Sequence, residues 1–458
     1  MSLTSVISRP RVRTRRGTEL FLLVFAVLVA MGAYATVGLA TKGELPAGMV
    51  AYGLGLGALA GAAHVVVRRF APYADPIMLP GVTLLNGLGL VLIHRLDLEN
   101  PEAGADAPLQ LVWTAVGVAL FVLVLMFVRD HRGLQRYTYT AGVAGLLLLA
   151  IPAFLPASMS EVNGAKIWIR LAGFSIQPGE FAKFLLMVFF AGYLVAKRDV
   201  LSLASKRVLG VDLPRGRDMG PLLVAWMASL GILVLERDLG TSLLFFGIFV
   251  AMLYVATERR SWLLLGITMF LSGGYVAYQL FGHVQLRINI WLDPFQDANG
   301  EGYQIVQAMY GFASGGILGT GLGQGRPDTV PFAKTDFIIA TTGEELGLTG
   351  LMAVLMVFGI IVQRGLRTSV AARDPFGKLL AAGLSFALAL QVFVVVGGVT
   401  KLIPLTGLTT PFLSYGGSSL VANWALIALL LRISDGARRP APEPSRAADL
   451  SETQVVRQ

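Results

Sequence analysis

The chain contains no cysteine, and its 458 residues include only four histidines. Without cysteine the protein has no disulfide bond, no thiolate metal site and no cysteine nucleophile. The histidines, at positions 64, 94, 131 and 283, are scattered and show none of the spacings of metal ligands. A metal centre built from histidine or cysteine is therefore not expected.

Charged residues are scarce as well. They make up 14% of the chain, whereas a soluble domain carries roughly 25%. Hydrophobic residues make up 55%, and the mean hydropathy is +0.68. The apolar residues gather in runs of about 17–25, the length at which a helix crosses a bilayer. These features predict an all-α polytopic membrane protein.

We expect about twelve membrane helices, with bounds set by the breakers between the apolar runs. They are 19–40, 48–68, 77–94, 111–128, 139–157, 181–196, 220–235, 240–257, 262–281, 346–363, 377–400 and 411–432. No clear small-residue cleavage site follows the first run, so we interpret it as a retained helix and not as a signal peptide. A long polar loop, 282–344, separates the ninth helix from the tenth, and long loops on a rigid scaffold often carry function.

The charges predict the orientation of these helices. With a cytoplasmic N-terminus, the inside segments hold 27 of the 37 Lys and Arg residues and the outside segments hold 10. Lys and Arg gather in the cytoplasmic loops of membrane proteins. We therefore expect both termini inside and the 282–344 loop outside. The net charge of +9 then belongs to a face that lies against anionic membrane lipids, and it does not indicate nucleic-acid binding.

The two ends of the chain differ in composition from the rest. Residues 1–18 are rich in arginine, and we expect a basic cytoplasmic arm. Residues 436–458 are polar, rich in Pro and Ala, and lack aromatic residues. Such a segment buries too little apolar surface to fold, so we expect a disordered cytoplasmic tail.

Four outside connections carry polar groups that a simple connector would not need. The first, residues 163–183, contains three cations on an otherwise acidic side: Lys166, Arg170 and Lys183. Three cations near one membrane surface suit an anionic headgroup such as a pyrophosphate. Glu180 follows Pro178, a pair equally typical of the first turn of a helix. Trp168 is typical of the aromatic belt at a membrane surface.

The second connection is Glu236, Arg237 and Asp238, at the end of an apolar helix. Charges in this position are costly unless they are paired or face a polar cavity. Two interpretations stay open here: an ion cluster solvated at the membrane surface, or part of a polar cavity beneath the long loop.

The third connection is the long loop itself. Asp293 and Asp297 stand among Pro, Asn and Gly residues and are more typical of turns than of catalysis. The glycine-rich stretch 315–325 lacks the spacing and the βαβ context of a nucleotide-binding loop. Asp336 differs from them, because it stands at the start of an apolar run. A carboxylate at the edge of hydrocarbon tends to have a raised pKa, which suits proton abstraction from a hydroxyl. The alternative is a helix N-cap.

The fourth connection, 405–419, is rich in small residues and hydroxyls, among them Ser414 and Ser418. Such residues usually mark close packing of membrane helices. The glycines before Ser418 also allow a broken helix that lines a cavity.

These clusters, in this order, resemble the shape, elongation, division and sporulation (SEDS) family, whose types are RodA, FtsW and SpoVE. The segments that carry the resemblance are NGAKIWIRLAGFSIQPGEFAK (163–183), RDLGTS (237–242), DPFQDANGEGYQIVQAMYGFASGGILGTGLGQG (293–325), TDFIIATTGEELG (335–347) and PLTGLTTPFLSYGGSS (404–419). The resemblance covers roughly residues 75–435 and implies a ten-helix core. Residues 19–68 match no part of the family pattern, so we expect a core of 69–435 preceded by two extra membrane helices.

The resemblance implies a peptidoglycan glycosyltransferase that polymerises lipid II, the undecaprenyl-pyrophosphate-linked precursor, on the outer face of the bacterial cytoplasmic membrane. Asp336 matches the aspartate of the family's TDF motif and is the expected catalytic base. Glu180, Lys183 and Asp238 match further family motifs, with Gly179 in place of Ser and Glu236–Arg237 in place of Gln-Pro. We expect these three residues, with Lys166, Trp168, Arg170, Ser414 and Ser418, to bind substrate. A class B penicillin-binding protein is the implied partner.

The expected reaction inverts the anomeric centre, with Asp336 removing the proton of the attacking sugar hydroxyl. Lys183, Lys166, Arg170 or a divalent cation such as Mg²⁺ or Mn²⁺ would stabilise the departing pyrophosphate. The RodA type, which serves cell elongation, is favoured over the FtsW type, which serves division. Two readings from other classes stay open: a transporter or flippase of lipid-linked precursors, and a non-enzymatic scaffold.

Overall fold

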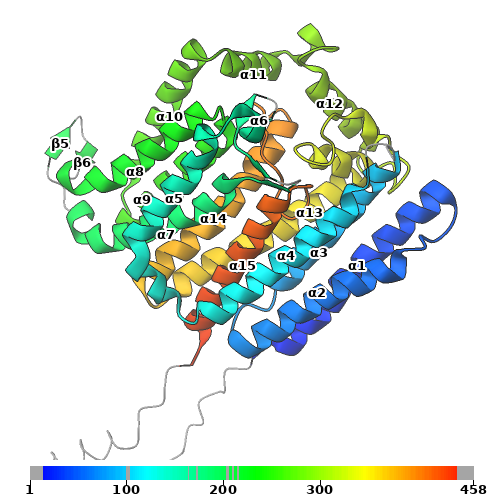
Figure 1. Ribbon diagram of the computed structural model, residues 1–458, viewed down its shortest axis with the longest axis horizontal. Helices are drawn as coiled ribbons and strands as arrows, with labels where there is room; N and C mark the ends of the chain where they lie inside the picture. The colour runs from blue at the N-terminus through cyan, green and yellow to red at the C-terminus, as the bar shows by residue number, and fades with distance from the viewer. Residues whose placement is uncertain are drawn as a thin grey trace, which may run out of the picture.

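The computed structural model describes residues 14–99, 104–162, 164–171, 174–202, 206–208, 211–213 and 216–440. Over these ranges the protein is a bundle of long helices (Figure 1). In this part of the chain eleven helices are long and apolar enough to cross a membrane, and a shorter apolar helical stretch spans Leu223–Ile232. The prediction of an all-α polytopic membrane protein is confirmed.

Each of the twelve predicted spans falls on a helix. These helices are α1 (Arg16–Lys42), α2 (Met49–Phe70), α3 (Met78–Glu99), α4 (Asp106–Phe127), α5 (Thr138–Phe154), α7 (Pro178–Ser202), α8 (Gly216–Leu235), α9 (Leu239–Thr257), α10 (Arg260–Leu280), α13 (Ile338–Ala371), α14 (Pro375–Val399) and α15 (Gly417–Arg438).

Shorter elements connect them. The short helices are η2 (His131–Tyr137), α6 (Ala157–Ser160), α11 (Gly282–Leu292), η3 (Pro294–Asp297), α12 (Tyr303–Gly315) and η4 (Pro327–Thr329). Three antiparallel hairpins pair β1 (Glu161–Val162) with β2 (Ala165–Lys166), β3 (Ile169–Leu171) with β4 (Phe174–Ile176), and β5 (Lys206–Val208) with β6 (Val211–Leu213). In the first hairpin Glu161 faces Lys166, and in the second Arg170 faces Ser175.

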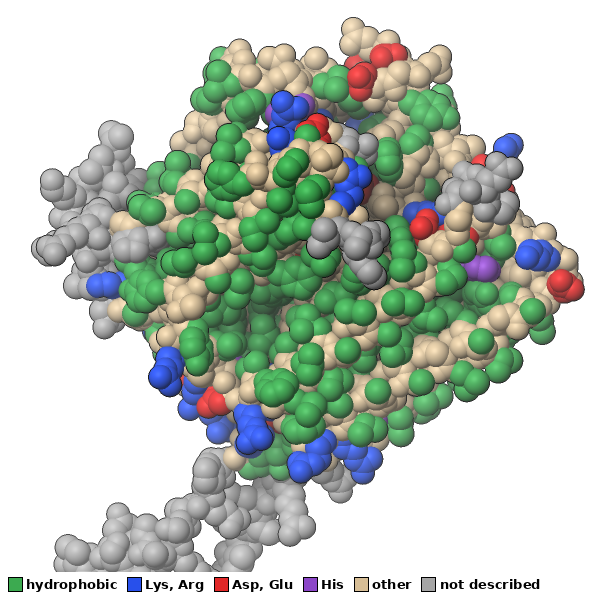
Figure 2. Space-filling model, viewed as in Figure 1, with side chains coloured by type: hydrophobic (Ala, Val, Ile, Leu, Met, Phe, Trp, Pro, Cys, Tyr) green, Lys and Arg blue, Asp and Glu red, His purple; other side chains and the backbone are tan. Residues whose placement is uncertain are grey.

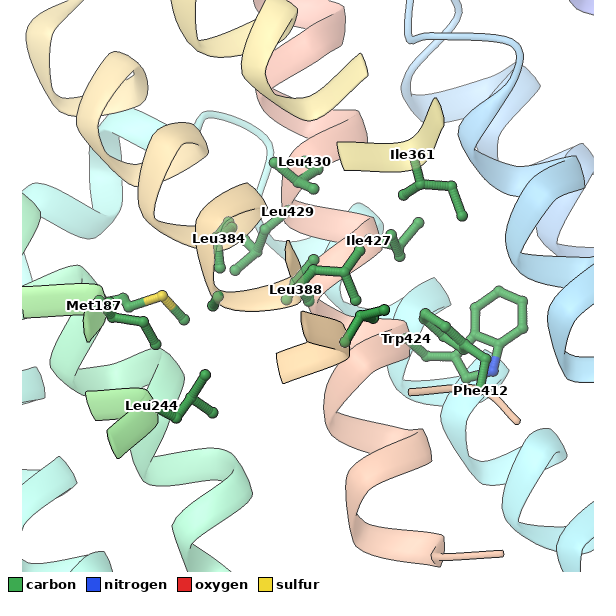
Figure 3. Close-up of a cluster of buried hydrophobic side chains, with 14 of the residues drawn as sticks. Met187, Leu244, Ile361, Leu384, Leu388, Phe412, Trp424, Ile427, Leu429 and Leu430 are labelled. Atoms are coloured by element: carbon green, nitrogen blue, oxygen red, sulfur yellow. The ribbon is translucent and has the colours of Figure 1, made fainter. Parts of the chain in front are cut away.

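The core lies where α7, α9, α13, α14 and α15 meet (Figure 3). Leu388 of α14 and Ile427 of α15 are fully buried there, and Trp424 packs edge-on against Phe412. The helices α3, α14 and α15 are buried over most of their length, whereas α10 is almost entirely exposed. A helix that is apolar all round and exposed is suited to contact with lipid.

Proline and aspartate fix two helix starts in this core. Pro178 begins α7, as predicted from its fixed φ angle. Pro375 begins α14, and the Asp374 carboxylate before it accepts a hydrogen bond of 2.6 Å from the Gly377 backbone N–H.

Basic residues gather at one end of the bundle, which we call the basic end. Figure 2 shows Lys and Arg side chains along the lower edge of the molecule, below a broad hydrophobic band. Arg438 and Arg364 pair with the buried Asp75 there, and Arg132 lies 3.5 Å from Asp374. The start of α1 belongs to the same end, because Arg16 donates to the Pro72 carbonyl at 3.1 Å.

The opposite end, which we call the loop end, shows two differences from the prediction. The 282–344 loop contains α11, η3, α12 and η4, and its last residues already belong to α13, which begins at Ile338 and not at 346. The last predicted helix, 411–432, begins only at Gly417. The reason lies in the backbone, since Phe412 has a φ of 64° and interrupts helical geometry before that point.

Helix α13 is broken at Gly347, whose φ of 68° and ψ of −175° are open to glycine but strained for other residues. The glycine-rich stretch 315–325 lies against this break. Its backbone N–H groups at Thr320 and Gly321 donate to the Glu344 and Glu345 carbonyls, at 2.9 and 3.0 Å. The stretch is therefore a support for a broken helix, in agreement with the rejection of a nucleotide loop.

The helix pair α1–α2 packs beside α3 at the edge of the bundle (Figure 1). Tyr34 of α1 stacks on Tyr52 of α2, with 4.8 Å between ring centroids. Leu322 of the glycine-rich stretch packs against the buried cluster of Tyr34, Val37 and Val91. The division of the chain into residues 19–68 and a core of 69–435 stays a prediction, and the predicted arm and tail lie largely outside the described residues.

Arg95 provides a test of how the break is held. Its side chain is 1% exposed, and it donates to Glu345 Oε1 at 2.9 Å and to the Gly325 carbonyl at 3.0 Å. We expect Arg95→Met to lower the unfolding free energy by about 3–5 kcal/mol, because it leaves the Glu345 carboxylate buried without its partner. Thermal unfolding in detergent measures this.

The double variant Arg95→Met/Glu345→Gln is the control. It should regain most of the lost stability, since no buried charge is left unpaired. Equal melting temperatures for wild type and Arg95→Met would contradict this account of the break.

Candidate active site

The irregular segment 405–414 connects the polar groups at the loop end. Its backbone carbonyls accept hydrogen bonds from side chains of three other elements. Arg287 of α11 donates to Leu405 at 3.0 Å, Gln391 of α14 donates to Thr409 at 3.0 Å, and Gln110 of α4 donates to Ser414 at 3.0 Å. The N-terminus of α9 approaches the same segment so closely that a Cβ at Gly240 would lie 2.7 Å from the Thr406 carbonyl oxygen.

Asp336 lies beside this segment, in the loop before α13. The helix takes its N-cap from Phe337, so Asp336 is not the cap that the alternative interpretation required. Its side chain is half-buried. Burial raises the pKa of Asp336 to about 6, a rise that the Arg287 guanidinium opposes and the Asp238 carboxylate favours. A carboxylate with this pKa is ionised at neutral pH and is a stronger base than an ordinary aspartate.

Asp238 stands at the N-terminus of α9, where its carboxylate accepts a hydrogen bond of 2.9 Å from the Thr241 backbone N–H. Burial raises the pKa of Asp238, while Thr241 and Arg287 oppose that rise. The neighbouring Glu236 is 2% exposed, and burial together with the Asp238 charge raises its pKa to about 8. A buried Glu236 does not fit an ion cluster solvated at the membrane surface, and the polar-cavity interpretation of this connection stays a prediction.

Glu180 and Lys183 lie one turn apart at the start of α7, and both are buried. Lys183 Nζ donates to Glu180 Oε2 at 2.9 Å and to Gln391 Oε1 at 3.1 Å. Through Gln391 this pair is joined to the Thr409 carbonyl and so to segment 405–414. Glu180 also acts electrostatically on Asp238. The two predicted residues belong to the same site as Asp336 through these partners.

The two predicted serines hold backbone. Ser414 donates to the Thr335 carbonyl at 2.6 Å and so connects segment 405–414 to the residue before Asp336. Ser418, in the first turn of α15, accepts a hydrogen bond of 2.9 Å from the Gln177 backbone N–H, next to the start of α7. Both hydroxyls bind backbone groups of the protein, so the two serines stabilise the structure around the site.

The remaining predicted residues lie on the hairpins above α7. Lys166 is half-buried, and its backbone N–H donates to the Glu236 carbonyl at 3.1 Å. Trp168 is half-buried next to α6 through a backbone bond of 3.2 Å to Ser160. Arg170 is exposed, and its guanidinium donates to the Glu161 carbonyl at 2.7 Å. No contact among the described residues joins Lys166, Arg170 and Lys183 into the single cationic cluster that the sequence suggested.

Sequence reasoning missed two polar residues of this site. Arg287 lies within electrostatic range of both Asp238 and Asp336, which raise its pKa against the stronger lowering effect of its own burial. Gln391 is 1% exposed in the middle of the bundle. Gln391 stands alone in the apolar middle of α14, and a lone polar residue in such a helix is the signal that would have indicated it. Arg287 shares α11 with His283, Gln285 and Asn289, so its helix gives no such signal.

Lys334 anchors the loop that carries Asp336. Its ammonium donates to Asp97 at 2.6 Å and to Asp106 at 2.9 Å, and its carbonyl accepts from the Tyr415 backbone N–H at 2.7 Å. A cavity of about 350 Å³ borders this anchor and is lined by Asp106, Asp328, Phe332 and Tyr415 among others.

Taken together, the loop end holds one carboxylate with a pKa near neutrality, a guanidinium that faces it, and a second carboxylate beside both. This set can accept a proton from a hydroxyl and can bind an anionic group.

A family model described as cell cycle protein, FtsW/RodA/SpoVE, matches residues 76–439. The chain belongs to this family. The match contains every predicted site residue and leaves α1 and α2 outside. The FtsW/RodA/SpoVE fold is also found in a solved structure of a peptidoglycan synthase complex that coordinates polymerization and crosslinking. That structure has a TM-score of 0.63 and is 26% identical, and the match covers 80% of this chain and 99% of that one.

Two relatives within the FtsW/RodA/SpoVE family differ in their similarity to this chain. The peptidoglycan glycosyltransferase RodA of Mycobacterium tuberculosis is 59% identical over 435 residues, which is 94% of this chain and 93% of the relative. The probable peptidoglycan glycosyltransferase FtsW of Trichlorobacter lovleyi is 35% identical over 382 residues, which is 80% of this chain and 94% of the relative. The chain is therefore more similar to the RodA type.

The anchor at Lys334 generates a prediction. We expect Lys334→Met to lower the unfolding free energy by about 1–3 kcal/mol, because Asp97, which is 7% exposed, loses its charged partner. Melting temperature in detergent measures the loss. Lys334→Arg keeps the positive charge and should retain most of the stability, and a full loss in that variant would contradict a charge-based anchor.

Proposed function

We propose that this protein is a peptidoglycan glycosyltransferase of the RodA type that polymerises lipid II during cell elongation. The similarity to a named RodA over nearly the whole chain supports the activity and the type. The observation that carries the site is Asp336, a half-buried carboxylate whose pKa burial raises to about 6, beside a guanidinium and a second carboxylate. The FtsW type, which serves division, is less favoured because the FtsW relative is less similar.

In the proposed reaction, the 4-hydroxyl of one lipid-linked disaccharide attacks the anomeric carbon of another. Asp336 takes the hydroxyl proton as the new carbon–oxygen bond forms, which typically contributes about 10²–10⁴-fold to the rate. The bond from the anomeric carbon to undecaprenyl pyrophosphate breaks, and the pyrophosphate leaves with the electron pair. One displacement inverts the anomeric centre. The good leaving group needs no acid to protonate it.

The substrate would reach the site from the membrane. Lipid tails can lie between exposed apolar helices such as α10, while the polar headgroup occupies the loop end. The basic end then faces the cytoplasm, as the excess of Lys and Arg favours. Both ends of the described chain belong to the basic end, which supports cytoplasmic termini and an extracytoplasmic site in the bacterial cytoplasmic membrane.

A divalent cation finds little support in the donor set. The described residues hold no group of three Asp, Glu, His or Cys side chains that could ligate a metal. The positive charge beside the carboxylates is that of Arg287. The requirement for Mg²⁺ or Mn²⁺ stays a prediction, which polymerisation with and without a chelator tests.

A class B penicillin-binding protein is the proposed partner. The matched structure of a peptidoglycan synthase complex, in which polymerization and crosslinking are coordinated, supports a transpeptidase beside this chain.

We expect Asp336→Ala to abolish polymerisation of purified lipid II, because the attacking hydroxyl loses its base. Glycan strands are measured by gel, with the cognate transpeptidase present. Asp328→Asn is the matched control, since Asp328 is an exposed carboxylate of the same loop and its variant should keep activity.

The outcomes separate the remaining classes. Equal product from wild type and Asp336→Ala would keep the enzyme and move the base to another carboxylate. No product from wild type would favour a flippase or a scaffold, which a lipid-flipping assay in vesicles then distinguishes.

The pKa of Asp336 predicts the pH dependence. The base must be ionised, so activity should fall as the pH drops through about 6 and should level off above it. A rate profile between pH 5 and 9 measures this limb. A profile that stays flat down to pH 5, as an aspartate with the ordinary pKa of about 3.9 would give, would contradict the buried environment of Asp336.

A further inference from the structure

Arg287 is a guanidinium in the site that neither the sequence motifs nor the proposed reaction uses. We propose that Arg287 is a positioning residue that keeps Asp336 in its basic, ionised form by facing it across a gap. This inference rests on the proposed function of Asp336 as the base.

Helix α11 holds Arg287 in a fixed place. Arg287 and Trp291 are four residues apart and so lie on one face of the helix. Arg287 donates to the Leu405 carbonyl at 3.0 Å, and Trp291 Nε1 donates to the Lys401 carbonyl at 3.1 Å. Two hydrogen bonds from one face to the same stretch of backbone fix the rotation of α11, which turns the guanidinium toward the site.

Gly407 shows how close the two groups are. A Cβ at this position would lie 3.6 Å from Asp336 Oδ2 and 3.8 Å from an Arg287 guanidinium nitrogen. Both groups therefore border the same small space, and no direct ion pair between them occurs among the described residues. A carboxylate locked in a direct ion pair is a poor base. A guanidinium across a gap favours the charged form and leaves the carboxylate oxygens free for a substrate hydroxyl.

Three other cations of the loop end are engaged elsewhere. Lys183 is bound by Glu180 and Gln391, Lys334 is bound by Asp97 and Asp106, and Arg170 donates to the Glu161 carbonyl. In the described part of the chain, Arg287 is thus the cation that acts on the Asp336 charge.

The effect of Asp238 on Asp336 is opposite to that of Arg287. Its carboxylate at the start of α9 disfavours a second negative charge at Asp336, whereas Arg287 of α11 favours it, and the Thr335 hydroxyl supports the charged form as well. Asp238 is itself influenced by Arg287 and Glu180. Because the two charges act on Asp336 in opposite directions, removing each one alone should move the ionisation of the base in opposite directions.

The experiment compares rate profiles from pH 5 to 9 for lipid II polymerisation by wild type, Arg287→Met, Arg287→Lys and Asp238→Asn. We expect the acid limb of Arg287→Met to move to higher pH by roughly one unit, with activity recovering on the alkaline side. Arg287→Lys keeps the charge and should stay near wild type. Asp238→Asn retains the helix cap and should move the limb to lower pH.

Each profile is normalised to its own maximum, and melting temperature and elution volume confirm that each variant is folded. Uniform loss of activity in Arg287→Met with an unmoved acid limb would overturn the proposal. So would a folded Arg287→Met variant that is inactive even at pH 9, where Asp336 is ionised without help. Activity in Asp336→Ala would instead overturn the proposed base, a result that is independent of the Arg287 profiles.

Discussion

The site depends on one constraint, which is that irregular backbone inside a membrane protein must have hydrogen-bond partners supplied by the protein. Segment 405–414 breaks the helical order between α14 and α15, and its carbonyls would otherwise lack donors. Arg287, Gln391 and Gln110 provide those donors from three different helices. The hydrogen bonds that satisfy these carbonyls therefore also hold polar side chains in the site. Two of these donors also belong to the surroundings of the carboxylates, since Arg287 acts on Asp238 and Asp336, and Gln391 binds Lys183, the partner of Glu180.

Segment 405–414 and the residue after it also hold the backbone next to Asp336 in place. Ser414 and Tyr415 hold the carbonyls of Thr335 and Lys334, so the residue that follows, Asp336, has little freedom. Burial and the Asp238 charge raise the pKa of this carboxylate, and the Arg287 guanidinium and the Thr335 hydroxyl offset part of that rise. The pKa of about 6 is the balance of these effects.

The sequence predicted the helices well and the loop end less well, for a physical reason. Long apolar runs are local signals, and each of the twelve predicted spans is a helix. The start of α13 was placed too late because Glu344 and Glu345 resemble a polar connector, yet both are buried by partners distant in the chain, such as Arg95. The motifs predict that four residues lie close together, and interactions link all four: Asp336 with Asp238, Asp238 with Glu180, and Glu180 with Lys183. Arg287 and Gln391 were missed because their roles exist only once α11 and α14 meet segment 405–414.

The helices α1 and α2 lie outside the family match but reach the same end of the molecule. Leu322 packs against the buried cluster of Tyr34, Val37 and Val91, the glycine-rich stretch supports the break in α13, and α13 begins two residues after Asp336. No polar group of α1 or α2 that the structure describes enters the site. The glycines of the stretch 315–325 permit close backbone approach to α13. Gly319 shows this, since a Cβ there would lie 2.3 Å from the Glu345 carbonyl oxygen. Because that approach leaves no room for a side chain, the glycine-rich stretch and the break in α13 pack backbone against backbone.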